Sequence, residues 1–353
     1  MTSKDQGAKR YAALALKGLA VDAFRKSGLA LNRAETVASI LLEADLLGFR
    51  THGFQRLKFN VDELTSKRSR VDGAPVILSD CGAVFNWDAD RLPGPYVVRE
   101  ALIEAQDRAR RHGVGVGVVR RAQHIACLAA YLPEVINNGF AVMICASTPD
   151  ERVLVSPNGT KPVLSNNPLA FGVPSSPNPC FFDISMASVT CGSIKQAQVT
   201  SQRLKDQFLR TPNGELTDDP NAFFDEPAAG ILPFGGEPSA HKGFLLSLWI
   251  ELMTSALGNF GPKDVDGGTE LNSVFVQVFD PDAFGSFEGF KQQVAAYQTM
   301  FAEDPAGQTR LPGERAWQRR QDQLENGVFL APNIVSNIEV MASELGLEMP
   351  KPT

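Results

Sequence analysis

The sequence predicts a mixed α/β fold, of either the α/β or the α+β class. Helical and strand patterns occur along the whole chain, and no internal repeat is apparent. The chain has 353 residues, of which 43% are hydrophobic, so it can bury a substantial core. This length exceeds the usual size of one domain, which favours two lobes.

The N-terminal region is expected to be helical. Apolar residues recur at helical spacing from Ala8 to Lys26, and Asn32-Arg33-Ala34-Glu35 resembles a capping box at the start of a second helix. The second helix carries an apolar stripe from Val37 to Leu47, and Gly48 is well placed to end it. A third helix is expected from Arg56 to Ser66.

The loop between the second and third helices carries reactive side chains, His52 and Arg56. Histidine can give or take a proton near neutral pH, and the planar donor fork of arginine suits a carboxylate. Because His52 follows a helix C-terminus, the negative end of the helix dipole is expected to favour the charged imidazolium. The alternative is that His52 only caps a helix and that the arginines are solvated.

The next stretch reads as a hairpin, a helix and a buried strand, at Val76–Ser79 with Ala83–Trp87, Pro95–His112 and Gly113–Val119. The glycines of the strand form a G-x-G-x-G pattern. The Rossmann fingerprint needs G-x-G-x-x-G at a turn from strand to helix, whereas these glycines lie within the strand. We therefore exclude a Rossmann site and attribute the glycines to close backbone packing.

His124 follows this strand and is expected to open a helix that runs to Asn137. The end of a strand is a common place for active-site groups, although a lone histidine there is more often structural. Strands are expected at Phe140–Cys145 and Phe181–Ser185. The segment between them, Ser156–Pro179, is rich in Pro, Gly, Ser and Asn and is expected to be a long loop or a run of turns.

In the second half a glycine-rich loop, Phe234–Gly243, precedes an apolar helix expected at Phe244–Leu257. A helix N-terminus beside Lys242 would be a site for an anion, because free N–H groups and the ammonium point the same way. The alternative is a buried helix with a flexible entry loop. A further strand, a turn after an acidic loop and a last helix are expected at Val274–Phe279, Leu311–Arg315 and Asn333–Leu345.

Composition excludes several classes of function. A net charge of −6 argues against a nucleic-acid partner, and no apolar run of 18 residues or more is present to span a membrane. The start of the chain lacks the apolar core of a secretory signal, so we expect a cytoplasmic protein. The five cysteines are expected to be reduced and mostly buried, and the four histidines lack the usual spacing of metal ligands.

Eight short motifs, taken in order, resemble those of one family. They are Thr51-His52-Gly53 with Arg56-Leu57, His124 with Tyr131, Ser165–Phe171, Asp183–Ser188, Asn213–Pro220, Leu232–Gly236, Lys242-Gly243 and Leu311–Arg315. The chain is identified by these motifs as a member of the type-2 malate/L-lactate dehydrogenases, which include ureidoglycolate, sulfolactate and diketogulonate oxidoreductases and cyclic imino-acid reductases. The resemblance covers nearly the whole chain.

The resemblance implies NAD(P)-dependent oxidoreduction on a fold that is not Rossmann. It implies a helical, dimerising domain from residues 1–75 and 320–353, and a nicotinamide-binding domain with a largely antiparallel sheet from residues 76–319, with the substrate cleft between them. The working unit would be a homodimer. By this likeness Arg56 holds the substrate carboxylate and His52 and His124 face the substrate. The implied cofactor contacts are Asp183, Met186, Ala187, Ser188, Lys242, Gly243, Pro312, Gly313 and Glu314.

Reduction of a 2-oxo acid at C2 creates an alkoxide, so it needs a proton donor within reach and a cation that fixes the carboxylate. Histidine and arginine meet both needs without a metal, and His52 is our first choice as donor, with His124 polarising the carbonyl. The expected substrate is a small carboxylate of the malate or lactate type; a cyclic imino acid or a ureidoglycolate is the alternative. NAD and NADP both stay open.

Two other classes of function stay open at this point. A metal-dependent hydrolase or lyase could gather His52, His124, His241 and Asp183 in one site. A binding protein that keeps the fold without catalysis is the other.

Overall fold

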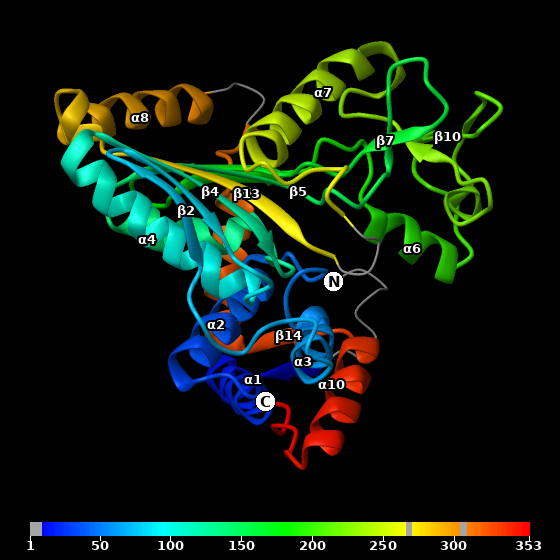
Figure 1. The fold of residues 1–353 in the computed structure, drawn as a ribbon, viewed down its shortest axis with the longest axis horizontal. Helices are drawn as coiled ribbons and strands as arrows, with labels where there is room; N and C mark the ends of the chain where they lie inside the picture. The colour runs from blue at the N-terminus through cyan, green and yellow to red at the C-terminus, as the bar shows by residue number, and fades with distance from the viewer. Residues whose placement is uncertain (1–8, 266–269, 304–308) are drawn as a thin grey trace.

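The computed structural model describes residues 9–265, 270–303 and 309–353. Helices and strands are mixed along the chain (Figure 1). The α-helices are α1 Ala13–Lys26, α2 Leu31–Leu47, α3 Leu57–Thr65, α4 Gly94–His112, α5 Leu132–Asn137, α6 Cys191–Val199, α7 Gly236–Glu251, α8 Phe287–Ala302, α9 Glu314–Asn326 and α10 Pro332–Leu345. Shorter helical turns are η2 Phe54–Arg56, η3 Leu128–Tyr131, η4 Pro220–Phe223, η5 Leu252–Ala256 and η6 Pro281–Phe284.

A seven-stranded sheet forms the centre of the described structure. From edge to edge it contains β2 Val76–Cys81, β3 Val84–Asp88, β4 Val114–Ala122, β13 Asn272–Phe279, β5 Ala141–Ser147, β8 Leu169–Val173 and β9 Cys180–Ile184. The pair β3·β4 is parallel, and the other neighbouring strands of this sheet are antiparallel. The expectation of a mixed fold with mostly antiparallel strands is therefore confirmed.

Two smaller sheets complete the strand content of the described residues. A five-stranded sheet contains β11 Leu216–Thr217, β10 Leu209–Arg210, β12 Gly230–Ile231, β6 Leu154–Val155 and β7 Pro162–Leu164. A two-stranded sheet pairs β1 Lys9–Tyr11 with β14 Val328–Leu330 in antiparallel register. This pair joins the first described residues to the last part of the chain, where α1, α3 and α10 also pack together (Figure 1).

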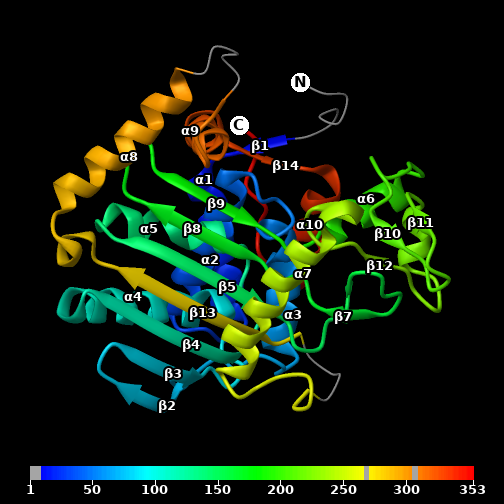
Figure 2. The same ribbon diagram turned by 90° about the horizontal axis from the view of Figure 1, so that it is seen from above.

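The seven-stranded sheet separates two apolar clusters. Helices α4 and α5 pack on one face, and α7 with η5 packs on the other (Figure 2). Neighbouring residues of β4 contribute to opposite clusters, because successive side chains of a strand point to opposite faces: Val119 joins the cluster under α2 and α4, and Val118 joins the other. Both faces of the sheet are therefore covered at its central strands, whereas the edge strand β2 is exposed along its length.

The glycines of β4 have the role predicted for them. A Cβ atom at Gly115 would lie 1.9 Å from the carbonyl oxygen of Ala105 in α4, and one at Gly117 would lie 2.1 Å from the ring of Phe85 in β3. Both contacts are too close for any side chain, so the glycines let a helix and a neighbouring ring approach the strand. The exclusion of a Rossmann turn at these residues agrees with this packing.

Two expectations for the N-terminal region are wrong. Residues Lys9–Tyr11 form β1, and α1 begins only at Ala13, because the backbone of these residues pairs with β14; Ala8 lies outside the described residues. The capping box at Asn32–Glu35 is also absent, because α2 already begins at Leu31 and its N-cap, Ala30, makes no capping bond through its side chain. Gly48 does end α2, in the left-handed conformation at φ 93°.

Three further elements differ from expectation. The Ser156–Pro179 stretch is not a plain loop, since it contains β7 and the inner strand β8, whose Leu169–Val173 backbone pairs with both β5 and β9. Helices α8 and α9 were not predicted at all. Part of the acidic loop expected before Leu311 lies outside the described residues.

Candidate functional site

The buried carboxyl group of Asp45 anchors the loop after α2 by a hydrogen bond to its backbone. Asp45, in the last turn of α2, is 1% exposed, and its Oδ2 accepts a hydrogen bond from the backbone N–H of Phe54 at 2.6 Å. A Cβ atom at Gly53 would lie 2.2 Å from this same oxygen, so glycine is required there. The start of η2, and with it Arg56, is thereby fixed against α2.

Burial dominates the protonation of Asp45. It raises the pKa from 3.8 to about 7, while the Phe54 N–H and the charge of Arg50 act in the opposite direction. The second carboxyl oxygen, Oδ1, is buried without a hydrogen-bond partner among the described residues. A protonated carboxyl group near neutral pH relieves part of the cost of that burial.

His52 and His124 meet although they lie far apart in the sequence. Their ring centroids are 5.8 Å apart and the ring planes are nearly parallel, at 19°. His52 comes from the loop after α2, and His124 lies in the loop after β4, separated from the strand by Gln123. The expectation that His124 opens a helix is wrong, because η3 begins only at Leu128. The edge of the Phe59 ring covers His124 at a centroid distance of 5.9 Å. The structure thus brings together the two histidines that the resemblance placed on the substrate.

A backbone hydrogen bond sets the tautomer of the neutral His124 ring. Its Nδ1 accepts the N–H of Ala126 at 3.2 Å, so in the neutral ring the hydrogen must be on Nε2. The Nδ1 of His52 lies 2.8 Å from the hydroxyl oxygen of Thr51, and either atom can donate. When Nδ1 of His52 donates, its Nε2 is left with a free lone pair.

Both histidines are neutral at neutral pH. Burial lowers the pKa of His52 from 6.5 to about 4, and the positive charge of Arg56 lowers it further. Burial, Arg56 and His52 hold the pKa of His124 well below 6.5. The expectation that the dipole of α2 favours a charged His52 is therefore wrong, because desolvation and a nearby cation outweigh it.

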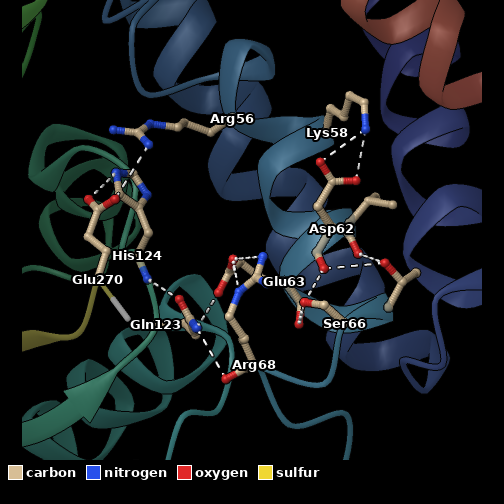
Figure 3. Close-up of polar contacts among 11 residues, drawn as sticks. Arg56, Lys58, Asp62, Glu63, Ser66, Arg68, Gln123, His124 and Glu270 are labelled. Atoms are coloured by element: carbon tan, nitrogen blue, oxygen red, sulfur yellow. Dashed lines mark hydrogen bonds and ion pairs between the residues drawn. The ribbon is translucent and has the colours of Figure 1, made fainter. Parts of the chain in front are cut away.

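Arg56 faces a carboxylate that the sequence did not reveal. Its Nη1 lies 3.7 Å from Oε2 of Glu270, and Oε1 of Glu270 lies 3.9 Å from Nε2 of His124 (Figure 3). The guanidinium of Arg56 also stacks over the Phe59 ring at 5.2 Å. Neither distance to Glu270 is short enough for a direct hydrogen bond, so the donors of Arg56 stay available to a ligand.

The predicted cofactor stretch around Asp183 is tied to the rest of the protein. Asp183 is partly buried, and its Oδ2 accepts the N–H of Ala129 at the start of η3; desolvation raises its pKa to about 6. Met186 and Ala187 are buried in the apolar cluster beside α6, and the hydroxyl of Ser188 donates to the carbonyl of Pro233 at 2.6 Å. These side chains thus have clear structural roles.

The predicted anion site at Lys242 is not at a helix start. Helix α7 begins at Gly236, with Gly235 as N-cap at φ 101°, so Lys242 lies in the second turn and is exposed. The helix starts early because these two glycines take left-handed conformations that turn the chain into it. Gly243 is needed for packing, since a Cβ atom there would lie 2.3 Å from the carbonyl oxygen of Phe234.

The turn at Pro312–Glu314 lies beside Asp183. Gly313 is the N-cap of α9 at φ 86°, Glu314 is the first residue of that helix, and the carbonyl of Pro312 accepts the N–H of Phe181 at 3.2 Å. A pocket of about 480 Å³ includes Gly313 and Asp183 in its lining. The other lining residues are Leu47, Gly48, Phe49, Phe181, Phe182, Arg310, Leu311, Arg315, Ala316 and Arg319; Lys242 and Gly243 are not among them.

The set proposed for a metal site is not gathered. In residues 9–265, 270–303 and 309–353, no group of three or more His, Cys, Asp or Glu side chains is arranged to hold a metal ion. His241 is exposed on α7, and the carboxylate of Asp183 accepts a hydrogen bond from the backbone of η3. Within the same residues, no helix has the length and apolar character needed to cross a bilayer.

With the geometry in view, comparison with known proteins identifies the family. A family profile described as malate/L-lactate dehydrogenase matches residues 12–339. The chain belongs to this family. It is therefore a dehydrogenase that acts on 2-hydroxy acids, and the resemblance read from the eight motifs is confirmed.

Individual relatives cover nearly the whole chain at modest identity. A malate/(S)-sulfolactate dehydrogenase of Methanothermus fervidus is 26% identical over 341 residues, which cover 94% of this chain and 97% of the relative. A Delta(1)-pyrroline-2-carboxylate/Delta(1)-piperideine-2-carboxylate reductase of Pseudomonas syringae pv. tomato is 28% identical over 340 residues, 91% of this chain and 94% of the relative.

Solved structures agree in fold. The malate dehydrogenase of Entamoeba histolytica superposes with a TM-score of 0.90 at 22% identity, covering 98% of this chain and 100% of that one. The sulfolactate dehydrogenase of Methanocaldococcus jannaschii gives 0.86 at 25% identity, covering 96% and 98%. At these identities the solved structures share the fold with this chain, while the substrates named for the relatives differ among themselves.

Sequence reasoning missed two residues of the site. Asp45 interrupts the apolar run Ala44–Leu47, and a carboxylate within a buried stripe is a signal that could have been noticed. Glu270 has no local pattern, because its contacts with Arg56 and His124 join segments more than a hundred residues apart.

Proposed function

We propose that this dehydrogenase transfers a hydride between NAD or NADP and C2 of a small 2-oxo or 2-hydroxy acid whose carboxylate is bound by Arg56. The observation that carries the proposal is the convergence of Arg56, His52 and His124 from two segments of the chain. A cation for the carboxylate and imidazoles for the reacting oxygen are the groups that this chemistry needs.

The two histidines have different roles in this proposal. The neutral ring of His124 carries its hydrogen on Nε2, so it can donate a hydrogen bond to the substrate oxygen and hold it in place. His52 is neutral, with a pKa of about 4, and can take the hydroxyl proton when a 2-hydroxy acid is oxidised. In reduction the same group returns that proton.

Arg56 acts on the substrate and on the histidines. Its charge lowers the pKa of both rings when no anion is bound. A substrate carboxylate on Arg56 offsets that charge, which favours protonation of His52. Binding an anionic 2-oxo acid therefore prepares the acid needed for its own reduction.

The pocket beside Asp183 fits the phosphate part of a nicotinamide cofactor. Arg310, Arg315 and Arg319 line it, together with Gly313 at the N-terminus of α9, and arginines at a helix start suit an anionic diphosphate. The cofactor, when bound, supplies or accepts the hydride. We propose that Asp183 and Pro312–Glu314 contact it, and we retain Met186, Ala187, Ser188, Lys242 and Gly243 as the contacts implied by the family.

The division into two domains is part of the proposal. Residues 1–75 and 320–353 would form the helical domain and residues 76–319 the cofactor domain, with the substrate between them. Arg56 and His52 belong to the first part, and His124, Glu270 and Asp183 belong to the second. The second boundary falls inside α9, Glu314–Asn326, so this helix would connect the two domains.

We also propose a homodimer, and we place its interface on α7 and the adjoining η5 instead of on the helical domain of the two chain ends that the resemblance implied. Leu245, Leu246, Trp249 and Leu252 are exposed there within a stretch of eight residues, and Leu245 is 61% exposed. The helices of the chain ends expose large apolar residues singly, such as Leu14 and Val340. A continuous apolar face is typical of a buried subunit contact. Sedimentation should show a dimer at micromolar concentration, and a monomer would refute the assembly.

A direct screen tests the function. Pyruvate, oxaloacetate, a cyclic imino acid and ureidoglycolate would each be offered with both forms of the appropriate cofactor, and nicotinamide absorbance would be followed. A 2-oxo acid should be reduced at the expense of NADH or NADPH. The cyclic imino acid is the second candidate, because a relative at 28% identity is named for that reaction. Absence of turnover with every 2-oxo acid would contradict the proposal.

A further inference from the structure

Glu270 is anchored at the site by its neighbour in the chain. Asn272, two residues later, is 5% exposed; its Oδ1 accepts the N–H of Ile125 at 3.2 Å and its Nδ2 donates to the hydroxyl of Thr148 at 2.8 Å. Ile125 follows His124 directly. The start of β13 is therefore fixed beside His124. The side chain of Glu270, just before this strand, points toward His124 and Arg56 (Figure 3).

The carboxylate of Glu270 lies where a substrate would meet the enzyme. It faces Arg56 at 3.7 Å and Nε2 of His124 at 3.9 Å, and its side chain is 39% exposed. These distances leave the guanidinium donors of Arg56 free to bind the carboxylate of a substrate. The negative charge of Glu270 then lies close to the rest of that substrate.

A further carboxyl group, Glu151, lies within electrostatic reach of Glu270 and Arg56. Glu151 is partly buried, and Asn166 Nδ2 lies 3.4 Å from its Oε2. Burial raises the pKa of Glu151, Glu270 and Glu251 raise it further, and Arg56 lowers it. Arg56 is thus the cation beside these carboxyl groups and the two neutral histidines, and Glu270 already offsets part of its charge before any substrate binds.

We propose that Glu270 is a specificity-determining residue, which admits substrates with one anionic group and rejects those with two. The inference rests on the proposed function, because it assumes that the substrate carboxylate binds Arg56. A second carboxylate or a sulfonate would lie beside the carboxylate of Glu270, and like charges brought together in a partly buried site weaken binding.

The preferred substrates follow from this charge arrangement. They are 2-oxo and 2-hydroxy acids with a single carboxylate and a neutral remainder, or compounds whose second group is cationic, such as a protonated cyclic imino acid. Dicarboxylic acids of the malate type and sulfonated acids are disfavoured. This separates the chain from relatives that are named for malate or sulfolactate.

A simpler role for Glu270 makes a different prediction. If Glu270 only pairs with Arg56 and restrains it, removing its charge changes the binding of every carboxylate by the same factor. If Glu270 sets specificity, removing the charge favours doubly charged substrates selectively. The ratio of two specificity constants therefore distinguishes the roles, because any general effect on Arg56 cancels.

The test compares pyruvate with oxaloacetate in the wild type and in Glu270→Gln, which keeps the size of the side chain. The wild type should favour pyruvate, and the substitution should shift the ratio of kcat/KM toward oxaloacetate by about tenfold or more, mainly through KM. Glu288→Gln is the matched control and should leave the ratio unchanged, because Glu288 is exposed and pairs with Lys291 on α8. Helix α8 lies apart from α3, which follows Arg56 (Figure 2).

Binding without turnover gives an independent measurement. Calorimetric titration with tartronate, a dianion, should show affinity increased about tenfold in Glu270→Gln, whereas oxamate, a monoanion, should change by less than about threefold. Equal changes for both ligands, or an unchanged ratio in kinetics, would overturn the specificity role and leave the proposed function intact. If Arg56→Ala binds oxamate as tightly as the wild type, the proposed function fails first, and the inference fails with it.

Discussion

Replacing Asp45 with Asn should stabilise the protein at high pH and leave its stability almost unchanged at low pH. The carboxyl group is buried, with Oδ2 bound to the Phe54 N–H and Oδ1 without a partner among the described residues. An amide of the same shape keeps an acceptor for Phe54 and carries no charge. The loop that presents His52 and Arg56 should therefore keep its position.

The size of the effect follows from the pKa of Asp45, which is raised from 3.8 to about 7 in the folded protein. Between these values the folded state holds a proton that the unfolded state has released, so the free energy of unfolding falls as pH rises. Over the whole interval the loss amounts to roughly 4 kcal/mol. Asp45→Asn removes this loss, and its advantage should be complete above the folded pKa.

Urea denaturation of the wild type and Asp45→Asn at about pH 4 and about pH 8 measures this difference. The midpoints should nearly coincide at the lower pH and separate at the higher pH in favour of the variant. The same separation at both pH values would show that Asp45 ionises normally and would refute the reasoning. Asp45→Ala, which removes the acceptor, should also lower kcat/KM by displacing the loop.

Three other predictions concern the same site and the cofactor. Gly53→Ala should cost about 1–3 kcal/mol of stability in denaturation, and lower activity, because its Cβ would meet the buried carboxyl of Asp45; normal values of both would show that the contact relaxes freely. Oxidation needs neutral His52 as the base, so kcat/KM for oxidation should rise with pH through about 4, the pKa of His52, and be flat above about 6. Reduction needs the protonated ring, so kcat/KM for reduction should fall as pH rises from about 4. An inflection near 6.5 in either profile would contradict the lowered pKa. Arg315→Ala should weaken NAD(P)H binding in a fluorescence titration by about tenfold or more, and by more than Lys242→Ala, which removes a charge outside the pocket; the reverse order would move the phosphate site to α7.

Regular patterns in the sequence were sufficient for much of the fold. The alternating run that became β4, the end of α2 at Gly48 and the strand β13 all follow from local periodicity and glycine placement. Strand β8 was missed, because its five residues stand between turn-forming segments and gain their strand conformation by pairing with β5 and β9. Helix α9 was missed because it is strongly polar and exposes most of its surface.

The site was less accessible to such reasoning than the fold. The loop with His52 and Arg56 stood out by residue type, but its meeting with His124 depends on how α2 packs against α4 and η3. The low pKa of both histidines could not be expected from the sequence, since it comes from burial and from the charge of Arg56 after folding. Glu270 likewise acquires its importance only through its neighbours in space.

The effect of His52→Ala on kcat tests the central claim most directly. With a 2-oxo acid at saturation, kcat should fall by roughly 10²–10⁴-fold while cofactor binding is kept. Arg56→Ala should mainly raise KM, and Arg56→Lys should restore little because it lacks the bidentate fork. If His52→Ala keeps a near-normal kcat while His124→Ala loses it, the roles are reversed; if both variants stay active, the histidine mechanism is wrong.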